Sequence, residues 1–519
     1  MKKIWKEFAS RAKLPFVATF VIGFLTHFYM LTNNYPNWDS VTSYVSGAYY
    51  THVGRWFMSP VSKISTVYQM PAVNGVLALI YIALAMVLLI DIFEIQSKIV
   101  IVVICGVTVT FPVVASSMSW VYLTDGFLAA FFLAVLAVWL IRKFGVKGVF
   151  PGGIALCLSL GIYQAYASVA LALILLVLLL EAVSSDIKKV LQQMLLYVCM
   201  AVLGAILYLV ILKIYLNNTG IQLSSYQGVS DLGNMSIIGM LKNIPGTYWP
   251  FLSEIRHGSE FSLTKWKLMA TLVLIVITGM MCLYLLIKKK ADRAQKFFDV
   301  VYCLLLMLAL PPVCNLAMLI SDATSYSMVM KMSYLIILWT PLVLIERIIV
   351  MDLGRYVKVG SLAKAVILLS SVYIMFGNYL EDNVAYLNTE LRYEKAYGLC
   401  NRIAARIESL PEYNANKISN VYVSLVDRGV GEESAGNTSL TDSYAGDISG
   451  TNGSVILTNE QTYVQFLNEH LGFHLERVDN DRKEEILSSE EYEGMDVWPA
   501  DSSVLVIEDT IVIKIHRGY

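Results

Sequence analysis

Charged residues are scarce in this chain. Only 15% of its 519 residues are Asp, Glu, Lys or Arg, while 57% are hydrophobic. The net charge of -1 gives no positive surplus for a nucleic-acid partner. No P-loop and no glycine-rich turn of a nucleotide-binding βαβ unit occurs, so ATP-driven transport by this chain alone is not indicated. The seven cysteines show neither Cys-x-x-Cys nor Cys/His spacing, which argues against a disulfide framework and a metal site.

Long apolar runs are abundant instead, and they predict an α-helical polytopic membrane protein. A bilayer core needs about 20 apolar helical residues. About eleven runs qualify or nearly qualify: 14–31, 71–93, 99–118, 120–141, 149–164, 166–183, 193–216, 267–287, 297–320, 328–346 and 361–379. The first run is too long, and its flanks too basic, for a cleaved signal peptide, so we expect a retained anchor.

Basic residues predict the orientation of these spans, because Lys and Arg collect in cytoplasmic loops. Five of them precede the first run, and the loops near residues 98, 142–147, 188–189, 288–293 and 355–364 are also basic. The N-terminus is therefore expected in the cytoplasm. With eleven spans, the outer loops 32–70 and 217–264 share the extracytoplasmic face with the tail.

The tail differs from the rest of the chain and predicts a small α/β domain at 381–519, following a membrane domain at 1–380. Residues 381–410 have the apolar periodicity of an amphipathic helix. Four β-like runs follow, at 421–426, 455–457, 504–507 and 511–515, with a helix expected near 460–471. The acidic segment 479–493 is expected to be a solvated loop.

The first outer loop contains the leading candidates for chemistry. Asp39 follows Trp38 a few residues after the first span, so its carboxylate should lie near the membrane surface. His52, Arg55 and Trp56 follow in the same loop; an arginine can hold a phosphate bidentately, and a tryptophan can stack on a sugar. The alternative is an interfacial helix over 40–50, in which Asp39 caps the N-terminus and Arg55 extends to the headgroups.

Two further charged residues lie at the outer ends of spans. Asp125 begins the fourth run, where a carboxylate next to hydrocarbon is costly and indicates function; the alternative is a helix-start acid favoured by the macrodipole. Lys331 could capture a lipid phosphate or extend outwards to water. In loop 217–264, Trp249 and Arg256 could line an acceptor groove, with interfacial anchoring as the alternative.

These features together resemble the type II glucosyltransferase (Gtr) family, within the broader GT-C superfamily of membrane glycosyltransferases. The resemblance rests on a retained first span, the Asn37-Trp38-Asp39 and Gly54-Arg55-Trp56 elements, about eleven spans and an extracytoplasmic tail. The segment 386–410 also looks like the family's post-membrane helix. The motifs are short, but the resemblance covers most of the chain.

The resemblance implies an enzyme of the bacterial cytoplasmic membrane. It would move a sugar, glucose by family default, from a polyprenyl-phosphate donor to a surface glycan such as O-antigen, with inversion. Asp39 would be the general base, Asp125 would orient the acceptor or Asp39, and Arg55 and Lys331 would hold the phosphate. Trp38, His52, Trp56, Trp249 and Arg256 would contact substrate. A separate donor synthase and flippase are implied partners.

Three questions remain open from the sequence. One is a non-enzymatic scaffold of surface-polymer synthesis, which predicts no loss of function when Asp39 is replaced by a neutral residue. Many relatives in the superfamily have paired acids in the first outer loop, whereas Asp39 stands alone, which leaves the use of a divalent metal undecided. A transporter or flippase of lipid-linked saccharides would share the span count. Such a protein should show internal two-fold repetition and polar residues at mid-membrane depth, and the sequence shows neither.

Overall fold

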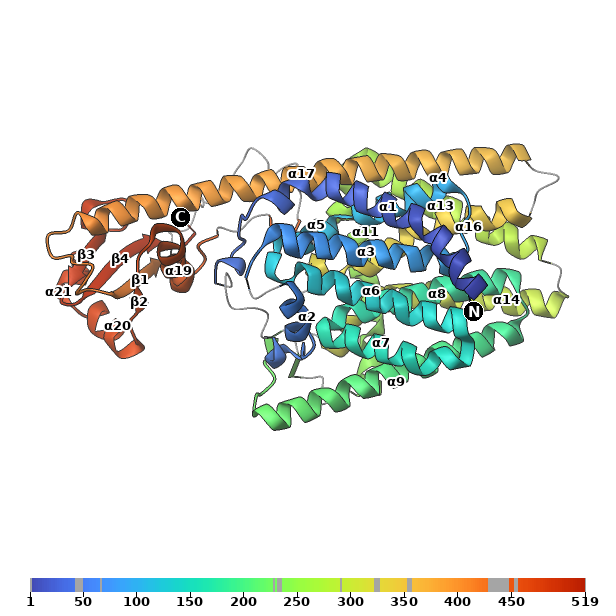
Figure 1. The fold of residues 1–519 in the computed structure, drawn as a ribbon, viewed down its shortest axis with the longest axis horizontal. Helices are drawn as coiled ribbons and strands as arrows, with labels where there is room; N and C mark the ends of the chain where they lie inside the picture. The colour runs from blue at the N-terminus through green and yellow to red at the C-terminus, as the bar shows by residue number, and fades with distance from the viewer. Residues whose placement is uncertain are drawn as a thin grey trace. The chain divides into compact units, whose positions relative to one another are not determined.

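The computed structural model describes residues 2–42, 50–65, 68–226, 229–230, 236–289, 292–321, 327–351, 357–427, 448–451 and 456–518. The chain forms two compact units (Figure 1). The membrane unit comprises residues 1–33 and 45–383, and the C-terminal unit comprises residues 34–44 and 384–519. The segment 34–44, which contains Asp39, thus belongs with the C-terminal unit although it follows the first helix in sequence.

All regular secondary structure in the described part of the membrane unit is helical. Its first half contains α1 (Lys2–Thr32), η2 (Thr51–Val53), α2 (Met58–Ser65), α3 (Pro71–Phe93), α4 (Lys98–Val109), α5 (Pro112–Ser119), α6 (Val121–Phe144), η3 (Gly145–Gly148), α7 (Val149–Ile162), η4 (Gln164–Tyr166) and α8 (Ala167–Ser184). Its second half contains α9 (Ile187–Thr219), α10 (Ile237–Asn243), η6 (Ile244–Thr247), α11 (Tyr248–His257), α12 (Ser259–Ser262), α13 (Lys265–Lys288), α14 (Arg293–Cys314), α15 (Leu316–Ile320), η7 (Met328–Met330), η8 (Met332–Leu335) and α16 (Ile336–Met351). The last helix, α17 (Val357–Glu408), contributes to both units.

Eight helices in the described part of the chain are long and apolar enough to cross a membrane, and nine if α4 and α5 form one bent span. The helices α4 and α5 meet at 42°, because Pro112 cannot continue the hydrogen-bond ladder of α4. Several apolar helices of this length make the chain a membrane protein. All eleven expected runs lie in largely helical segments, while the count of eleven spans stays a prediction.

One of these eight segments, Val121–Ile162, consists of two helices, α6 and α7, which form a hairpin. The chain reverses at η3, and the hydroxyl of Ser159 in α7 donates to the carbonyl oxygen of Ala130 in α6 at 2.8 Å. Figure 1 shows α6 and α7 lying side by side. Gly152 permits this approach, since a Cβ there would lie 3.0 Å from the carbonyl oxygen of Ala137. The expected runs 120–141 and 149–164 correspond to these two helices.

Three acids at helix ends are neutralised by basic residues from the expected cytoplasmic loops. The pairs are Asp91–Lys143 at 3.0 Å, Glu181–Arg142 at 2.6 Å and Asp299–Lys289 at 2.6 Å. Lys289 also donates to the carbonyl oxygens of Ala182, in the last turn of α8, and of Ser185, just after that helix. Buried or half-buried pairs with added hydrogen bonds fix the helix ends against each other. The orientation of this end toward the cytoplasm stays a prediction.

The C-terminal unit contains a four-stranded sheet in the order β2-β1-β4-β3. Its strands are β1 (Asn420–Val426), β2 (Glu476–Arg477), β3 (Val504–Ile507) and β4 (Thr510–His516). The strand β1 is parallel to β2 and β4, whereas β3 and β4 form an antiparallel hairpin. The helices are α19 (Glu460–Leu471), α20 (Asn480–Leu487) and α21 (Glu490–Glu493), with short turns η1 (Ser40–Thr42) and η9 (Asp501–Ser503).

The structure confirms the expected small α/β fold in this part and corrects two local expectations. The helix at 460–471 is present, fixed by a capping box between Asn459 and Thr462. The acidic segment 479–493 is not a loop: α20 and α21 form there, each capped by a side chain, from Asp479 and Ser489. Of the expected strand at 455–457, the first residue lies outside the described part, and the other two are buried without forming a strand.

Candidate functional site

A tight loop after η2 presents Arg55 in the membrane unit. The turn ends at Gly54, whose φ of 76° lies in the left-handed region that favours glycine. The carbonyl oxygen of Gly54 accepts a hydrogen bond from the hydroxyl of Tyr208 in α9 at 3.1 Å. The side-chain amide of Gln164 donates to the carbonyl oxygen of Val53 at 2.9 Å. Side chains from two distant elements thus fix the backbone next to Arg55.

The guanidinium of Arg55 lies against two aromatic rings. Its central carbon is 4.4 Å from the ring centroid of Tyr163 and 5.7 Å from that of Tyr50. Tyr50 is held in turn by a 2.8 Å hydrogen bond between its hydroxyl and that of Tyr122. Arg55 is half-buried, and among the described residues it has no carboxylate partner. A planar cation oriented by rings and lacking an anion is suited to bind a phosphate.

The neighbours of Arg55 lie in different surroundings. Trp56 is 8% exposed and packs against Tyr208 and Leu212. A Cβ at Gly161 would lie 2.7 Å from the Trp56 ring, so only glycine permits this contact. His52 is exposed, and its carbonyl oxygen accepts from the backbone N–H of Ser224 at 2.8 Å. The loops 32–70 and 217–264 therefore meet at His52, while Trp56 belongs to the packed interior.

Asp125 is buried near the start of α6 and is connected to the Arg55 loop through α2. Its side chain is 1% exposed, and Oδ1 accepts from the Asn74 amide at 3.2 Å. The same amide nitrogen lies 3.2 Å from the hydroxyl of Ser65, the last residue of α2. The other oxygen of Asp125 has no hydrogen-bond partner among the described residues. A buried carboxyl with an unused oxygen is a costly feature.

Lys331 is held by two glutamates from the loop 217–264. Its ammonium nitrogen is 2.7 Å from Oε2 of Glu254 in α11 and 3.7 Å from Oε1 of Glu260 in α12. Burial and the charge of Glu260 raise the pKa of Glu254 to about 8, so this carboxyl is mostly protonated at neutral pH. Burial is the largest influence on Glu260 and opposes its ionisation, but Lys331, Glu254 and the other groups nearby together lower the pKa of Glu260.

The helix α11 shows two different faces. Trp249 and Arg256 are seven residues apart, which places them on one side of the helix, and both are exposed, Trp249 by 74%. Phe251 is 7% exposed and stacks on Tyr334 with ring centroids 5.3 Å apart. The outer face of α11 is therefore open to a ligand, while the inner face fixes the helix beside Lys331.

A second buried charge cluster lies where α13 meets α17, and the sequence reasoning missed it. Lys267 and Glu381 form a 2.8 Å ion pair, with side-chain exposures of 3% and 0%. Asp382 is fully buried, and neither of its oxygens has a hydrogen-bond partner in the described part of the chain. The adjacent acids directly after the last apolar run were a signal for this site, since carboxylates at that depth are costly.

Asp39 and Trp38 lie in the C-terminal unit. Asp39 is exposed and Trp38 is half-buried. The side-chain oxygen of Asn37 accepts from the backbone N–H groups of Asp39 and Ser40, at 3.1 and 2.8 Å, which fixes the turn. Val41 is fully buried in the core of this unit. Of the interfacial helix expected over 40–50, the described part shows the short turn η1, and residues 43–49 lie outside the described part.

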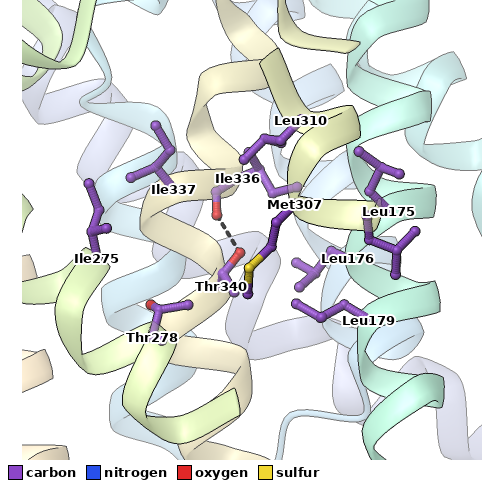
Figure 2. A pocket seen from close by; sticks show the side chains of 12 residues that line it. Leu175, Leu176, Leu179, Ile275, Thr278, Met307, Leu310, Ile336, Ile337 and Thr340 are labelled. Atoms are coloured by element: carbon purple, nitrogen blue, oxygen red, sulfur yellow. Dashed lines mark hydrogen bonds between the residues drawn. The ribbon is translucent and has the colours of Figure 1, made fainter. Parts of the chain in front are cut away.

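An apolar cavity of about 290 Å³ lies among α8, α13, α14 and α16 (Figure 2). Leu175, Leu179, Ile275, Met307 and Ile337 contribute side chains to its wall. Thr278 and Thr340 are the polar side chains labelled at this cavity. The hydroxyl of Thr340 donates to the carbonyl oxygen of Ile336 at 2.6 Å. Because the helix backbone satisfies the Thr340 hydroxyl, the cavity wall is suited to hydrocarbon.

The structure thus sorts the expected site residues into groups. His52, Arg55 and Trp56 share one loop; Lys331 meets α11, the helix with Trp249 and Arg256; Asp125 is buried beside α2; Trp38 and Asp39 belong to the C-terminal unit. Among the described residues, no three His, Cys, Asp or Glu side chains are grouped so that they could hold a metal ion.

Comparison with known families identifies the chain. The model of the family described as "Glucosyl transferase GtrII" matches residues 28–340, which is more than half of the sequence. The chain therefore belongs to this glucosyltransferase family, as its motifs predicted. No match was found among curated proteins or solved structures.

Proposed function

We propose that this member of the GtrII family transfers glucose from a polyprenyl-phosphate donor to a surface glycan on the extracytoplasmic face of the bacterial cytoplasmic membrane. The enzyme would have a GT-C-like membrane domain at 1–380 and an extracytoplasmic domain at 381–519, with its N-terminus in the cytoplasm. The observation that carries the donor assignment is Arg55, a guanidinium fixed on two aromatic rings with no carboxylate partner among the described residues. Such a group stabilises the negative charge that develops on a leaving phosphate.

Lys331 would be the second phosphate contact in this proposal. Its immediate partner Glu254 is mostly protonated at neutral pH, because burial and Glu260 raise its pKa to about 8. A neutral carboxyl is easier to displace from an ammonium than a carboxylate. A donor phosphate could therefore replace Glu254 on Lys331 while Glu260 keeps its own contact.

The isoprenoid tail of the donor requires an apolar surface within the membrane. The cavity in Figure 2 supplies one, lined by leucine, isoleucine and methionine side chains. Burying hydrocarbon stabilises a complex by about 25 cal/mol per Å². We therefore assign this cavity to part of the tail.

Catalysis would proceed by direct displacement. Asp39 accepts the proton of the acceptor hydroxyl as its oxygen attacks the anomeric carbon, and the bond to the donor phosphate breaks with inversion. Its exposed position, on a turn fixed by Asn37, supports this role. Asp125 would orient the acceptor or Asp39. A general base typically contributes about 10² to 10⁴-fold to rate.

The acceptor glycan would contact Trp38, His52, Trp249 and Arg256. The exposure of Trp249 and Arg256 on one face of α11 supports their assignment. Trp56 has little exposed ring surface, so in this proposal its main effect is to hold the Arg55 loop. Donor supply requires a separate synthase and a flippase. The alternative, a transporter of lipid-linked saccharides, has no support from the family match.

The test is a donor comparison in sealed membranes that contain the full chain. Radiolabelled polyprenyl-phosphate glucose and radiolabelled UDP-glucose are supplied separately, each with surface polysaccharide, and label in the polymer is measured. We expect label from the lipid donor alone. Label from UDP-glucose in membranes stripped of donor synthase would contradict the donor assignment. Movement of lipid-linked glucose across the membrane without transfer would favour the transporter.

A further inference from the structure

Five ring-bearing side chains form a connected group in the C-terminal unit. Tyr35 comes from the segment that contains Asp39, Tyr393 and Tyr397 from α17, and Phe466 and His470 from α19; we call these five the aromatic cluster. Tyr393 is central, with ring centroids 5.4 Å from Tyr35, 6.2 Å from Tyr397, 5.8 Å from Phe466 and 5.5 Å from His470.

The aromatic cluster is fixed on one side and open on the other. Phe466 is fully buried in the core and lies 4.3 Å from the ring of His470, which orients the imidazole. Tyr397 is 42% exposed, while Tyr35, Tyr393 and His470 are half-buried. Aromatic rings of this kind present a large apolar face and a polar edge at little conformational cost.

Polar groups at the edge of the cluster could recognise hydroxyls. The hydroxyl of Tyr35 donates to Oε1 of Glu390 at 2.9 Å, and a 3.3 Å hydrogen bond joins the Tyr393 hydroxyl to Nδ1 of His470. Burial lowers the pKa of His470, which favours the neutral form of its ring. A half-buried carboxylate and neutral ring edges offer hydrogen-bond acceptors and donors at fixed positions.

The charged residues on the helix faces that carry the cluster are mainly acidic, and the cations nearest to Tyr393 in sequence on α17 are the exposed Lys395 and the buried Arg392. Glu390, Tyr393, Glu394 and Tyr397 follow the spacing i, i+3, i+4, i+7, so they share one face of α17. Glu394 is exposed, as is Glu469 on α19. A polyanion or an anionic lipid headgroup would be repelled here, whereas a neutral polyhydroxylated ligand would not. The chemistry therefore favours a neutral sugar chain, whose C–H faces pack on rings and whose hydroxyls donate to carboxylates.

The segment of Tyr35 also connects the cluster to Asp39. The two residues are four positions apart; Asn37 fixes the turn between them, and the fully buried Val41 anchors the chain just after Asp39. A sugar chain on the cluster would thus be held by the same rigid segment that positions the proposed base. That arrangement would deliver successive hydroxyls of a polymer to one point.

We propose that the aromatic cluster binds sugar residues of a neutral polymeric acceptor and so makes the C-terminal unit the acceptor-binding unit of the enzyme. The assignment to an acceptor rests on the proposed transferase function. Binding of the glycan itself does not require the donor, which allows the two proposals to be tested separately.

The experiment measures binding of fluorescein-labelled neutral polysaccharide, extracted from the surface of cells that encode the chain, to the full-length protein in nanodiscs without donor. Tyr397→Ala and Glu390→Gln are compared with wild type. Tyr373→Ala, which removes an equally exposed tyrosine (44%) from the membrane part of α17, is the matched control. We expect at least about tenfold weaker binding for Tyr397→Ala, weaker binding for Glu390→Gln, and no change for the control.

Unchanged binding in both cluster variants would overturn the proposal, as would tighter binding of wild type to dextran sulfate than to the neutral polysaccharide. A transfer assay with the lipid donor tests the aromatic cluster separately from the proposed transferase function. Normal transfer with an unchanged KM for acceptor in Tyr397→Ala refutes the cluster and leaves the transferase intact. Loss of glycan binding in Tyr397→Ala, together with no transfer by wild type, supports the cluster and refutes the proposed function.

Discussion

The ammonium nitrogen of Lys331 lies 2.7 Å from Oε2 of Glu254, and this ion pair joins the loop 217–264 to the segment before α16. Glu260, 1% exposed, completes the group at 3.7 Å. Two carboxyls around one ammonium cannot both be ionised cheaply in a buried place. The group therefore holds a proton near neutral pH.

Replacing Glu254 by glutamine should flatten the pH dependence of stability. The pKa of Glu254 is raised from 4.5 to about 8 in the folded protein, so the folded state binds a proton that the unfolded chain has released between these values. Stability should therefore fall as pH rises from about 4.5 to about 8. Thermal unfolding in detergent across this range tests it. In Glu254→Gln, stability should fall less steeply with pH than in wild type. In Glu412→Gln, which changes an exposed residue, the pH dependence of stability should stay the same. Equal slopes in all three proteins would contradict the shift.

Arg55 variants should weaken donor use selectively. Arg55→Gln removes the guanidinium, and Arg55→Lys keeps a charge but loses bidentate geometry and ring stacking. We expect KM for the lipid donor to rise at least about tenfold in Arg55→Gln and by less in Arg55→Lys. A tenfold rise corresponds to a loss of about 1.4 kcal/mol of donor binding free energy. KM for the acceptor should not change. Lys188→Gln, an exposed charge on α9, is the control. A donor KM equal to that of wild type would remove Arg55 from the phosphate site.

The buried pair Lys267–Glu381 should behave as a coupled unit. Lys267→Met leaves Glu381 and Asp382 without their cation and should cost about 3–5 kcal/mol of stability. Adding Glu381→Gln to Lys267→Met should recover part of this loss, because the second variant removes the uncompensated charge. Denaturation of the single and double variants gives the coupling energy. Strictly additive effects would show that the two side chains do not interact.

Trp56→Ala should mainly reduce stability. The ring is 8% exposed and packs on Gly161, Tyr208 and Leu212, so its removal leaves a cavity worth about 3–5 kcal/mol. The folded fraction should keep a normal KM for acceptor. Thermal unfolding and initial rates, measured on the same preparation, separate the two effects. Unchanged stability with a raised acceptor KM would restore a substrate-stacking role for Trp56.

Local sequence signals predicted much of this fold. Apolar runs marked the helices because the bilayer requires them, and the helix expected near 460–471 is present as α19. The two helices α6 and α7 correspond to the two separate runs expected at 120–141 and 149–164. The family resemblance, drawn from short motifs around Asp39 and Arg55, was confirmed by the match over 28–340.

Other features could not be predicted, because they depend on residues distant in sequence. The membership of Asp39 in the C-terminal unit depends on Tyr35 contacting Glu390, 355 positions away. The pairing of Lys331 with Glu254 and of Lys267 with Glu381 likewise requires the tertiary fold. Helices α20 and α21 were missed because their acidic composition resembles a solvated loop, although their side-chain caps favour helices.

The central claim is that Asp39 takes the proton from the acceptor hydroxyl during transfer from the lipid donor. Single-turnover transfer of radiolabelled glucose from polyprenyl phosphate to surface polysaccharide tests it most directly, comparing wild type with Asp39→Asn. We predict that transfer in Asp39→Asn falls by about 10² to 10⁴-fold, while donor binding is unchanged. A near-normal transfer rate in Asp39→Asn would contradict the claim and move the search for the base to Asp125.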